Sequence, residues 1–96
     1  MFRRARVDRG RLDALERIEA WTRARFGLGP DAVVLVGEAT CLQPGYPPLE
    51  TTVRFWIAGE RYRFTIFKSA DAVFEDDVPI AWLLPSLLDD GDAGCC

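Results

Sequence analysis

The residues best suited to chemistry are two adjacent thiols, Cys95 and Cys96, which close the final stretch DDGDAGCC. Thiolates bind soft metal ions such as zinc or Cu(I), and they also exchange disulfides or carry thiol-linked groups. Two thiolates leave a four-coordinate zinc site half filled, so a second copy of the chain or a partner protein would complete the shell. The sequence therefore predicts Cys95 and Cys96 as ligands for a soft metal ion, zinc or copper.

Two alternatives for the tail stay open. In the first, one tail cysteine reacts covalently, as in a thiol-exchange or sulfur-carrier protein. The carboxylates of Asp89, Asp90 and Asp92 oppose this role, because nearby negative charge keeps a thiol protonated and slows its attack. In the second, the chain is a plain protein-interaction module and its tail thiols are incidental.

The terminal Cys95-Cys96 also resembles the prenylation signal of Rab-type small GTPases, which implies lipid attachment at these thiols. The resemblance covers two residues, and the sequence has no GxxxxGK[ST] phosphate loop of the kind GTPases use. The third cysteine, Cys41, lies in a predicted strand, where burial as a small apolar side chain is expected.

The sequence offers little to a catalytic mechanism. It contains no histidine, which excludes Ser-His-Asp and Cys-His nucleophiles and mixed His/Cys zinc sites. Neither a GxGxxG nor a GxxxxGK[ST] loop occurs. The acidic pairs Asp76-Asp77 and Asp89-Asp90 belong to a helix start and a tail, where carboxylates are normally solvated. We expect a non-enzymatic protein.

A cluster of apolar residues near the C-terminus is the first candidate for partner binding. The segment 80–88 carries more large apolar side chains than one short helix can bury on a single face. Such a surplus either packs on the back of a sheet or forms an exposed patch for a partner. The predicted partner-binding residues of this segment are Trp82, Leu83, Leu84 and Leu87.

A second candidate surface combines Trp56 with Arg54 and Arg63 on the solvent side of a predicted hairpin. Tryptophan and arginine are enriched in interface hot spots, and together they can also stack on nucleic-acid bases. The competing expectation is that the acidic C-terminal part of the same chain covers Trp56.

Charge is distributed unevenly along the 96 residues, whose net charge is −3. Residues 1–30 hold eight Arg and four acids (+4), residues 31–68 hold four of each sign (0), and residues 69–96 hold seven acids and no base (−7). An acidic balance disfavours nucleic-acid binding. The expected partner is a larger protein or a second copy of the chain. Without an apolar run long enough for a membrane span, and without the apolar stretch of a secretory signal, the expected location is cytoplasmic.

The first half of the chain predicts one helix and one strand. An apolar face recurs at helical spacing over 8–26, with Asp8 as N-cap and Gly27 as the left-handed residue after the helix. A strand is expected over 32–42, with Gly37 as a bulge or close-contact point. One face of this strand, on which Cys41 would be buried, comprises Val33, Leu35, Ala39 and Cys41.

The stretch 49–68 predicts a β-hairpin. Gly59-Glu60 suits a two-residue type II′ turn with glycine first. That turn fixes a register in which Ile57 faces Tyr62, Phe55 faces Phe64 and Val53 faces Ile66 on the core side. On the other side Trp56 would face Arg63, and Arg54 would face Thr65.

The rest of the chain predicts short helical pieces over 70–75 and 79–88, with Ser69 as a cap, Pro79 in a first helical position and Pro85 as a stop. The whole is predicted to be one α+β domain over 1–88. An N-terminal amphipathic helix packs on a three-stranded antiparallel meander, followed by short C-terminal helices. Residues 89–96 form an acidic, glycine-containing flexible tail ending in Cys-Cys.

Overall fold

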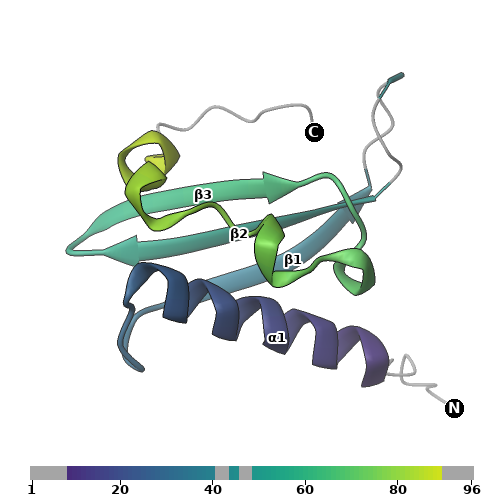
Figure 1. The fold of residues 1–96 in the computed structure, drawn as a ribbon, viewed down its shortest axis with the longest axis horizontal. Coiled ribbons are helices and arrows are strands. Elements are labelled where there is room, and N and C mark those ends of the chain that lie inside the picture. Colours follow the sequence, from purple (N-terminus) through teal and green to yellow (C-terminus); the bar gives the residue numbers. More distant parts are fainter. Residues whose placement is uncertain (1–8, 41–43, 46–48, 90–96) are drawn as a thin grey trace, which may run out of the picture.

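A computed structural model describes residues 9–40, 44–45 and 49–89, with side chains from residue 12 onward. The elements follow one another as helix α1 (Arg9–Phe26), strands β1 (Val34–Thr40), β2 (Leu49–Ile57) and β3 (Glu60–Ile66), and the 3₁₀ helices η1 (Ala70–Ala72), η2 (Glu75–Asp77) and η3 (Ala81–Leu87). The strands form an antiparallel sheet in the order β1-β2-β3 (Figure 1). The predicted α+β fold is confirmed.

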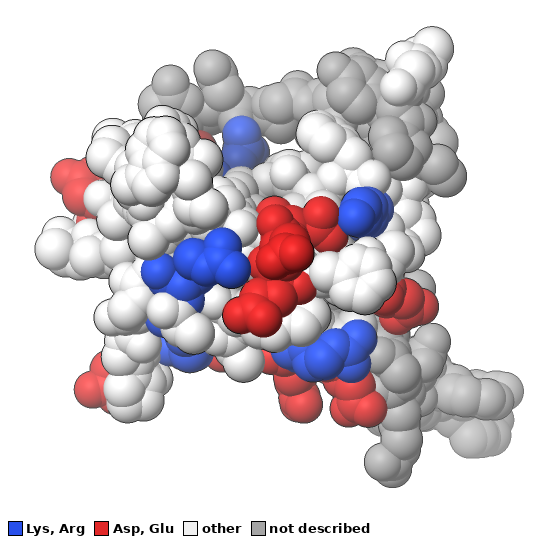
Figure 2. Space-filling model, viewed as in Figure 1, with Lys and Arg blue, Asp and Glu red and all other residues white. Residues whose placement is uncertain are grey.

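The chain builds two layers. One layer is the sheet, and the other consists of α1 together with the chain from η1 to η3, which returns across the same face of the sheet (Figure 1). Figure 2 views the molecule from the side of this second layer. Between the layers lies the apolar core, whose buried members are Ala14, Ile18, Val34, Val53, Phe55, Phe64, Ile66, Ala70, Val73 and Val78.

Helix α1 buries the face that the sequence predicts. Ala14, Ile18 and Thr22 follow one another at i,i+4 and are fully buried. The Thr22 hydroxyl donates a hydrogen bond of 2.8 Å to the Ile18 carbonyl, which satisfies its polar group inside the core. Leu12, near the start of the helix, is 46% exposed.

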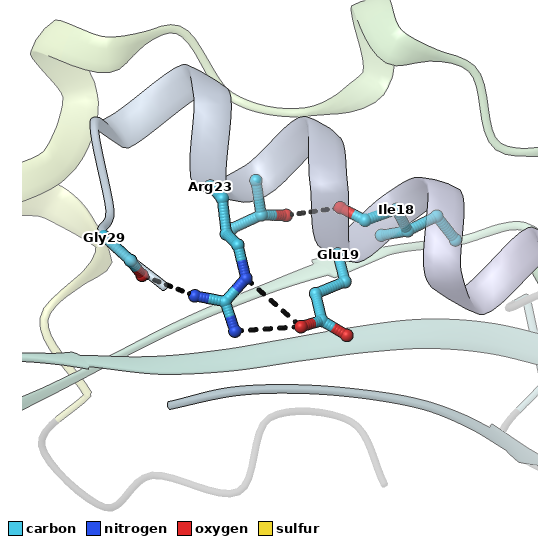
Figure 3. Close-up of polar contacts among 5 residues, drawn as sticks. Ile18, Glu19, Arg23 and Gly29 are labelled. Atoms are coloured by element: carbon cyan, nitrogen blue, oxygen red, sulfur yellow. Dashed lines mark hydrogen bonds and ion pairs between the residues drawn. The ribbon is translucent and has the colours of Figure 1, made fainter. Parts of the chain in front are cut away.

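The end of α1 is closed as the sequence predicts. Gly27 has φ of 66°, and the Leu28 amide donates to the Arg23 carbonyl at 2.8 Å, which is the Schellman arrangement. The Arg23 guanidinium donates to Glu19 Oε2 at 2.8 and 3.1 Å and to the Gly29 carbonyl at 2.7 Å (Figure 3). Arg23 therefore ties the helix end to the turn that leads into β1.

Strand β1 is shorter than predicted, and its buried face is the opposite one. Val34 is buried, whereas Val33 and Leu35 are 52% and 55% exposed. The Val-rich start of the strand is apolar on both sides, so hydrophobicity alone does not select the face. Gly37 forms no bulge, because it pairs regularly with Thr52. Cys41 lies outside the described residues.

The hairpin has a different turn from the predicted one. Its loop is Ala58-Gly59, with φ of 52° and 85°, as a type I′ turn requires. The register is shifted by two residues: Phe55 faces Tyr62, Val53 faces Phe64, Trp56 faces Arg61 and Arg54 faces Arg63. Because side chains alternate with a period of two, the shift leaves every residue on its predicted face.

The C-terminal helical pieces are 3₁₀ helices. Pro79 lies before η3, and Pro85 lies inside it rather than ending it. Proline has no N–H, so Pro85 leaves the Trp82 carbonyl without its 3₁₀ donor, which a helix of this length tolerates. Ser69 occupies the N-cap position of η1 without a side-chain hydrogen bond. The Ala70 amide donates instead to Glu38 Oε2 of β1 at 2.7 Å.

No helix in the described ranges has both the length and the apolar character needed to cross a bilayer.

Candidate functional site

Helix η3 sorts its side chains into two rows. A 3₁₀ helix has three residues per turn, so residues three apart lie above one another. Leu84 and Leu87 are partly buried and pack against the core. The next row, Trp82, Pro85 and Leu88, is exposed, with Trp82 75% and Leu88 50% accessible. The predicted apolar surplus is thus divided between the core and the surface.

The exposed row is completed by neighbouring residues. Ile80, which precedes η3, is exposed, and Leu83 is half-buried. We call Ile80, Trp82, Pro85 and Leu88 the η3 surface. It consists of uncharged side chains on a molecule whose net charge is −3.

The C-terminal end of η3 is attached to strand β3, which forms one edge of the sheet. Leu88 forms an antiparallel bridge with Tyr62 of β3, and the Asp89 amide donates to the Arg61 carbonyl at 2.9 Å. Arg61 Nε also forms an ion pair of 3.0 Å with Asp89 Oδ2, and the Asp89 side chain is only 4% exposed. Asp89, the first residue of the predicted tail, is therefore bound to β3.

Arg25 binds the chain just before the N-terminal end of η3. Its Nη1 donates to the carbonyls of Val78 at 2.7 Å and Pro79 at 3.1 Å, and its Nη2 donates to the Glu75 carbonyl at 3.3 Å. These bonds join the last turn of α1 to the chain that enters η3. The sequence indicates only a favourable interaction of Arg25 with the helix dipole, because nothing in it signals a contact across fifty residues.

An acidic surface lies next to η3. Helix η2 consists of Glu75, Asp76 and Asp77. Figure 2 shows acidic side chains gathered over this helix, with basic side chains between them and the uncharged side chains that cover η3. Phe74, just before η2, is 68% exposed, with Lys68 Nζ 5.9 Å from the centre of its ring. The surroundings of η3 therefore carry both signs of charge, with the acids of η2 on one side and Arg25 and Arg61 at the two ends of η3.

Asp77 is the most strongly bound of these acids. Its carboxylate accepts a hydrogen bond of 2.9 Å from the Phe74 amide and bonds of 3.0 and 3.1 Å from Lys68 Nζ. The Phe74 amide, followed by Lys68, lowers the pKa of Asp77 below 3.8, the ordinary value for aspartate. The ionised carboxylate therefore stabilises the fold.

Replacing Asp77 with Asn is expected to destabilise the protein by under about 1 kcal/mol at neutral pH, since the site is partly exposed to solvent. The folded-state pKa is depressed, so the stabilisation is present above 3.8 and is lost as the pH falls through the folded value. Urea unfolding at pH 7 and at pH 2.5 measures this. An Asp76→Asn variant is the control, and a deficit of Asp77→Asn that persists at low pH contradicts the account.

The second predicted surface lies on the sheet face away from α1. Arg54 is exposed and stands opposite Arg63, and Trp56 is half-buried opposite Arg61. The chain from η1 to η3 covers the other face, so within the described residues it does not cover Trp56. The structure therefore does not bring Trp56, Arg54 and Arg63 together with Trp82.

The predicted metal ligands Cys95 and Cys96 lie outside the described residues. Among the residues that are described, no three or more His, Cys, Asp or Glu side chains are grouped so that they could hold a metal ion.

Comparison with known proteins finds no match: no protein-family model, no curated protein and no solved structure matches the chain.

Proposed function

We propose that this chain is a small non-enzymatic accessory protein that docks on a larger protein through the η3 surface. The observation that supports the proposal is Trp82, a large aromatic side chain that is 75% exposed. Tryptophan is among the residues that most often dominate binding energy at interfaces. An exposed apolar patch on a small domain is typical of a partner-binding site.

The anchoring of η3 supports the same proposal. Leu84 and Leu87 hold its inner row in the core, while Arg25 and Asp89 fix its two ends. A surface that is already ordered loses little conformational entropy on binding. The backbone that carries Trp82 is therefore ordered before binding, although the Trp82 side chain itself is exposed.

The acidic side chains of η2 indicate which charge a partner protein would carry opposite them. Glu75 and Asp76 are exposed beside the apolar surface. A complementary partner carries an apolar cavity that accepts an indole ring, with Lys or Arg side chains on the side that meets η2. Such a surface belongs to a protein, and the acids of η2 oppose a nucleic acid.

The tail thiols enter the proposal as ligands. Cys95 and Cys96 would present two thiolates to a soft metal ion, zinc or copper, beside the docked partner. The support for this part is the sequence alone. A thiol-exchange or sulfur-carrier protein is the alternative of a different class. The proposed location is the cytoplasm.

Site-specific photo-crosslinking in the native host tests the docking proposal. We expect p-benzoylphenylalanine at position 82 to yield one adduct of defined mass, which excess wild-type protein suppresses. The same group at position 12 is the control, because Leu12 is also exposed and belongs to the first turns of α1, the part of that helix farthest from η3 in Figure 1. Equal adducts from positions 12 and 82, or none from position 82, contradict the proposal.

A further inference from the structure

The sheet face that points away from α1 combines apolar and basic side chains. The pairing of the strands arranges them in two rows that run across the sheet from β1 to β3. One row consists of Leu35, Arg54 and Arg63, and the neighbouring row consists of Val33, Trp56 and Arg61. We call these six residues the outer sheet face. Each row begins with an aliphatic side chain and ends with an arginine.

The apolar end of the outer sheet face is accessible. Val33 and Leu35 are 52% and 55% exposed, and Trp56 beside them is half-buried. Helix α1 and the chain from η1 to η3 lie over the opposite face of the sheet (Figure 1). Exposed aliphatic side chains next to a tryptophan are typical of a surface that another molecule covers.

The basic end of the outer sheet face contains a like-charge pair. Arg54 stands directly opposite Arg63, although like charges in this arrangement destabilise a sheet. Arg54 is exposed, and no carboxylate of the described residues forms an ion pair with it. Local rules of this kind are most often broken at functional sites. The pair therefore indicates that Arg54 serves binding rather than stability.

The exposed charge of this face is positive. Glu50, the acid that the alternation of β2 places on the same side, is buried toward the other end of the strand. Arg61 is neutralised by its ion pair with Asp89. Arg63 is half-buried and takes part in a further contact. Arg54 is therefore the main group that an anionic partner would meet.

We propose that the outer sheet face binds an acidic segment of a partner protein. Carboxylates of that segment pair with Arg54 and reduce its repulsion with Arg63. Apolar side chains of the same segment cover Val33, Leu35 and Trp56. Neighbouring strands lie about 4.8 Å apart, so the apolar and basic ends of the face are within about 10 Å of each other. One peptide segment spans that distance.

The composition of the face favours a protein over a nucleic acid. The aliphatic side chains of Val33 and Leu35 offer no ring on which a base could stack. The chain has a net charge of −3, and Asp89 already neutralises Arg61, so few positive charges remain for phosphates. Helix η3 lies over the other face of the sheet, so the inference is independent of the proposed function (Figure 1).

Selection from a random-peptide library tests the chemistry of the partner. The bait is the full chain with Trp82→Ala, which truncates the most exposed side chain of the η3 surface. We expect the enriched peptides to combine several Asp or Glu residues with at least one large apolar residue. Their binding, measured by fluorescence anisotropy, should weaken as the salt concentration rises. Enriched peptides without an excess of acidic residues, or no enrichment, overturn the proposal.

The variant Arg54→Glu, made in the same bait, separates a binding role from a structural one. Glutamate opposite Arg63 replaces a like-charge pair by an opposite-charge pair, so the variant should be at least as stable to urea as its parent. Its affinity for the enriched peptides should nevertheless fall by about tenfold or more. The matched control is Arg17→Glu, which changes the net charge equally at an exposed position of α1 and should leave the affinity unchanged.

Other occupants of the face give distinct results. Unchanged peptide affinity in Arg54→Glu overturns the proposal. So does a labelled single-stranded oligonucleotide that binds the parent more tightly than the peptides do, because the face would then serve a nucleic acid. Self-association that Arg54→Glu abolishes in analytical ultracentrifugation would assign the face to a second copy. Enrichment of peptides only by a chain ending at Asp89 would assign it to residues 90–96.

Discussion

A protein carrying Phe55→Ala is expected to lose about 3–5 kcal/mol of its free energy of unfolding. Phe55 is fully buried at the centre of β2. Its ring stacks on Phe26 of α1 at 5.1 Å and on Tyr62 of β3 at 5.4 Å, and it meets Phe64 edge-on at 6.4 Å. Removing it leaves a cavity at the point where the helix, β2 and β3 meet.

Urea unfolding monitored by circular dichroism measures this loss. Small domains have about 5–15 kcal/mol in total, so the variant should unfold at a much lower urea concentration than the wild type. Phe74→Ala is the control, because that ring is 68% exposed and its loss should cost under about 1 kcal/mol. Equal costs for the two substitutions contradict the described core.

The second large effect is expected from Arg25→Ala, at about 2 kcal/mol. The guanidinium donates hydrogen bonds to three carbonyls in the segment that leads into η3, those of Glu75, Val78 and Pro79. Without it these carbonyls lose a charged donor, and α1 no longer holds the C-terminal segment.

Arg25→Lys is the informative comparison for this prediction. Lysine keeps the positive charge but cannot donate from a planar fork to several acceptors. We expect it to restore less than half of the stability lost in Arg25→Ala, as measured by urea unfolding. Wild-type stability in Arg25→Lys would show that charge alone matters at this position.

Local patterns make α1 and the inner face of the hairpin predictable. Ala14, Ile18 and Thr22 recur at helical spacing, and Gly27 supplies the left-handed residue that ends the helix. The hairpin register is less accessible to prediction. Gly59 fits either of two turns, and the observed one requires a positive φ at Ala58, which alanine rarely adopts.

Two features of the candidate site depend on tertiary structure. The division of η3 into a buried and an exposed row follows from its 3₁₀ period of three, whereas the sequence favours a short helix of unspecified winding. The contact of Arg25 with Val78 joins residues that are distant in sequence. In contrast, the surplus of apolar residues that identifies the segment around Trp82 is visible in the sequence itself.

The most direct test of docking through η3 is the dissociation constant for the purified protein that crosslinks at position 82, measured by calorimetry with wild type and Trp82→Ala. The account predicts at least about 30-fold weaker binding, corresponding to a hot-spot loss of about 2 kcal/mol or more. Leu12→Ala should bind like the wild type. Binding by Trp82→Ala within about threefold of the wild type, with its fold intact, would contradict the claim that Trp82 anchors the partner.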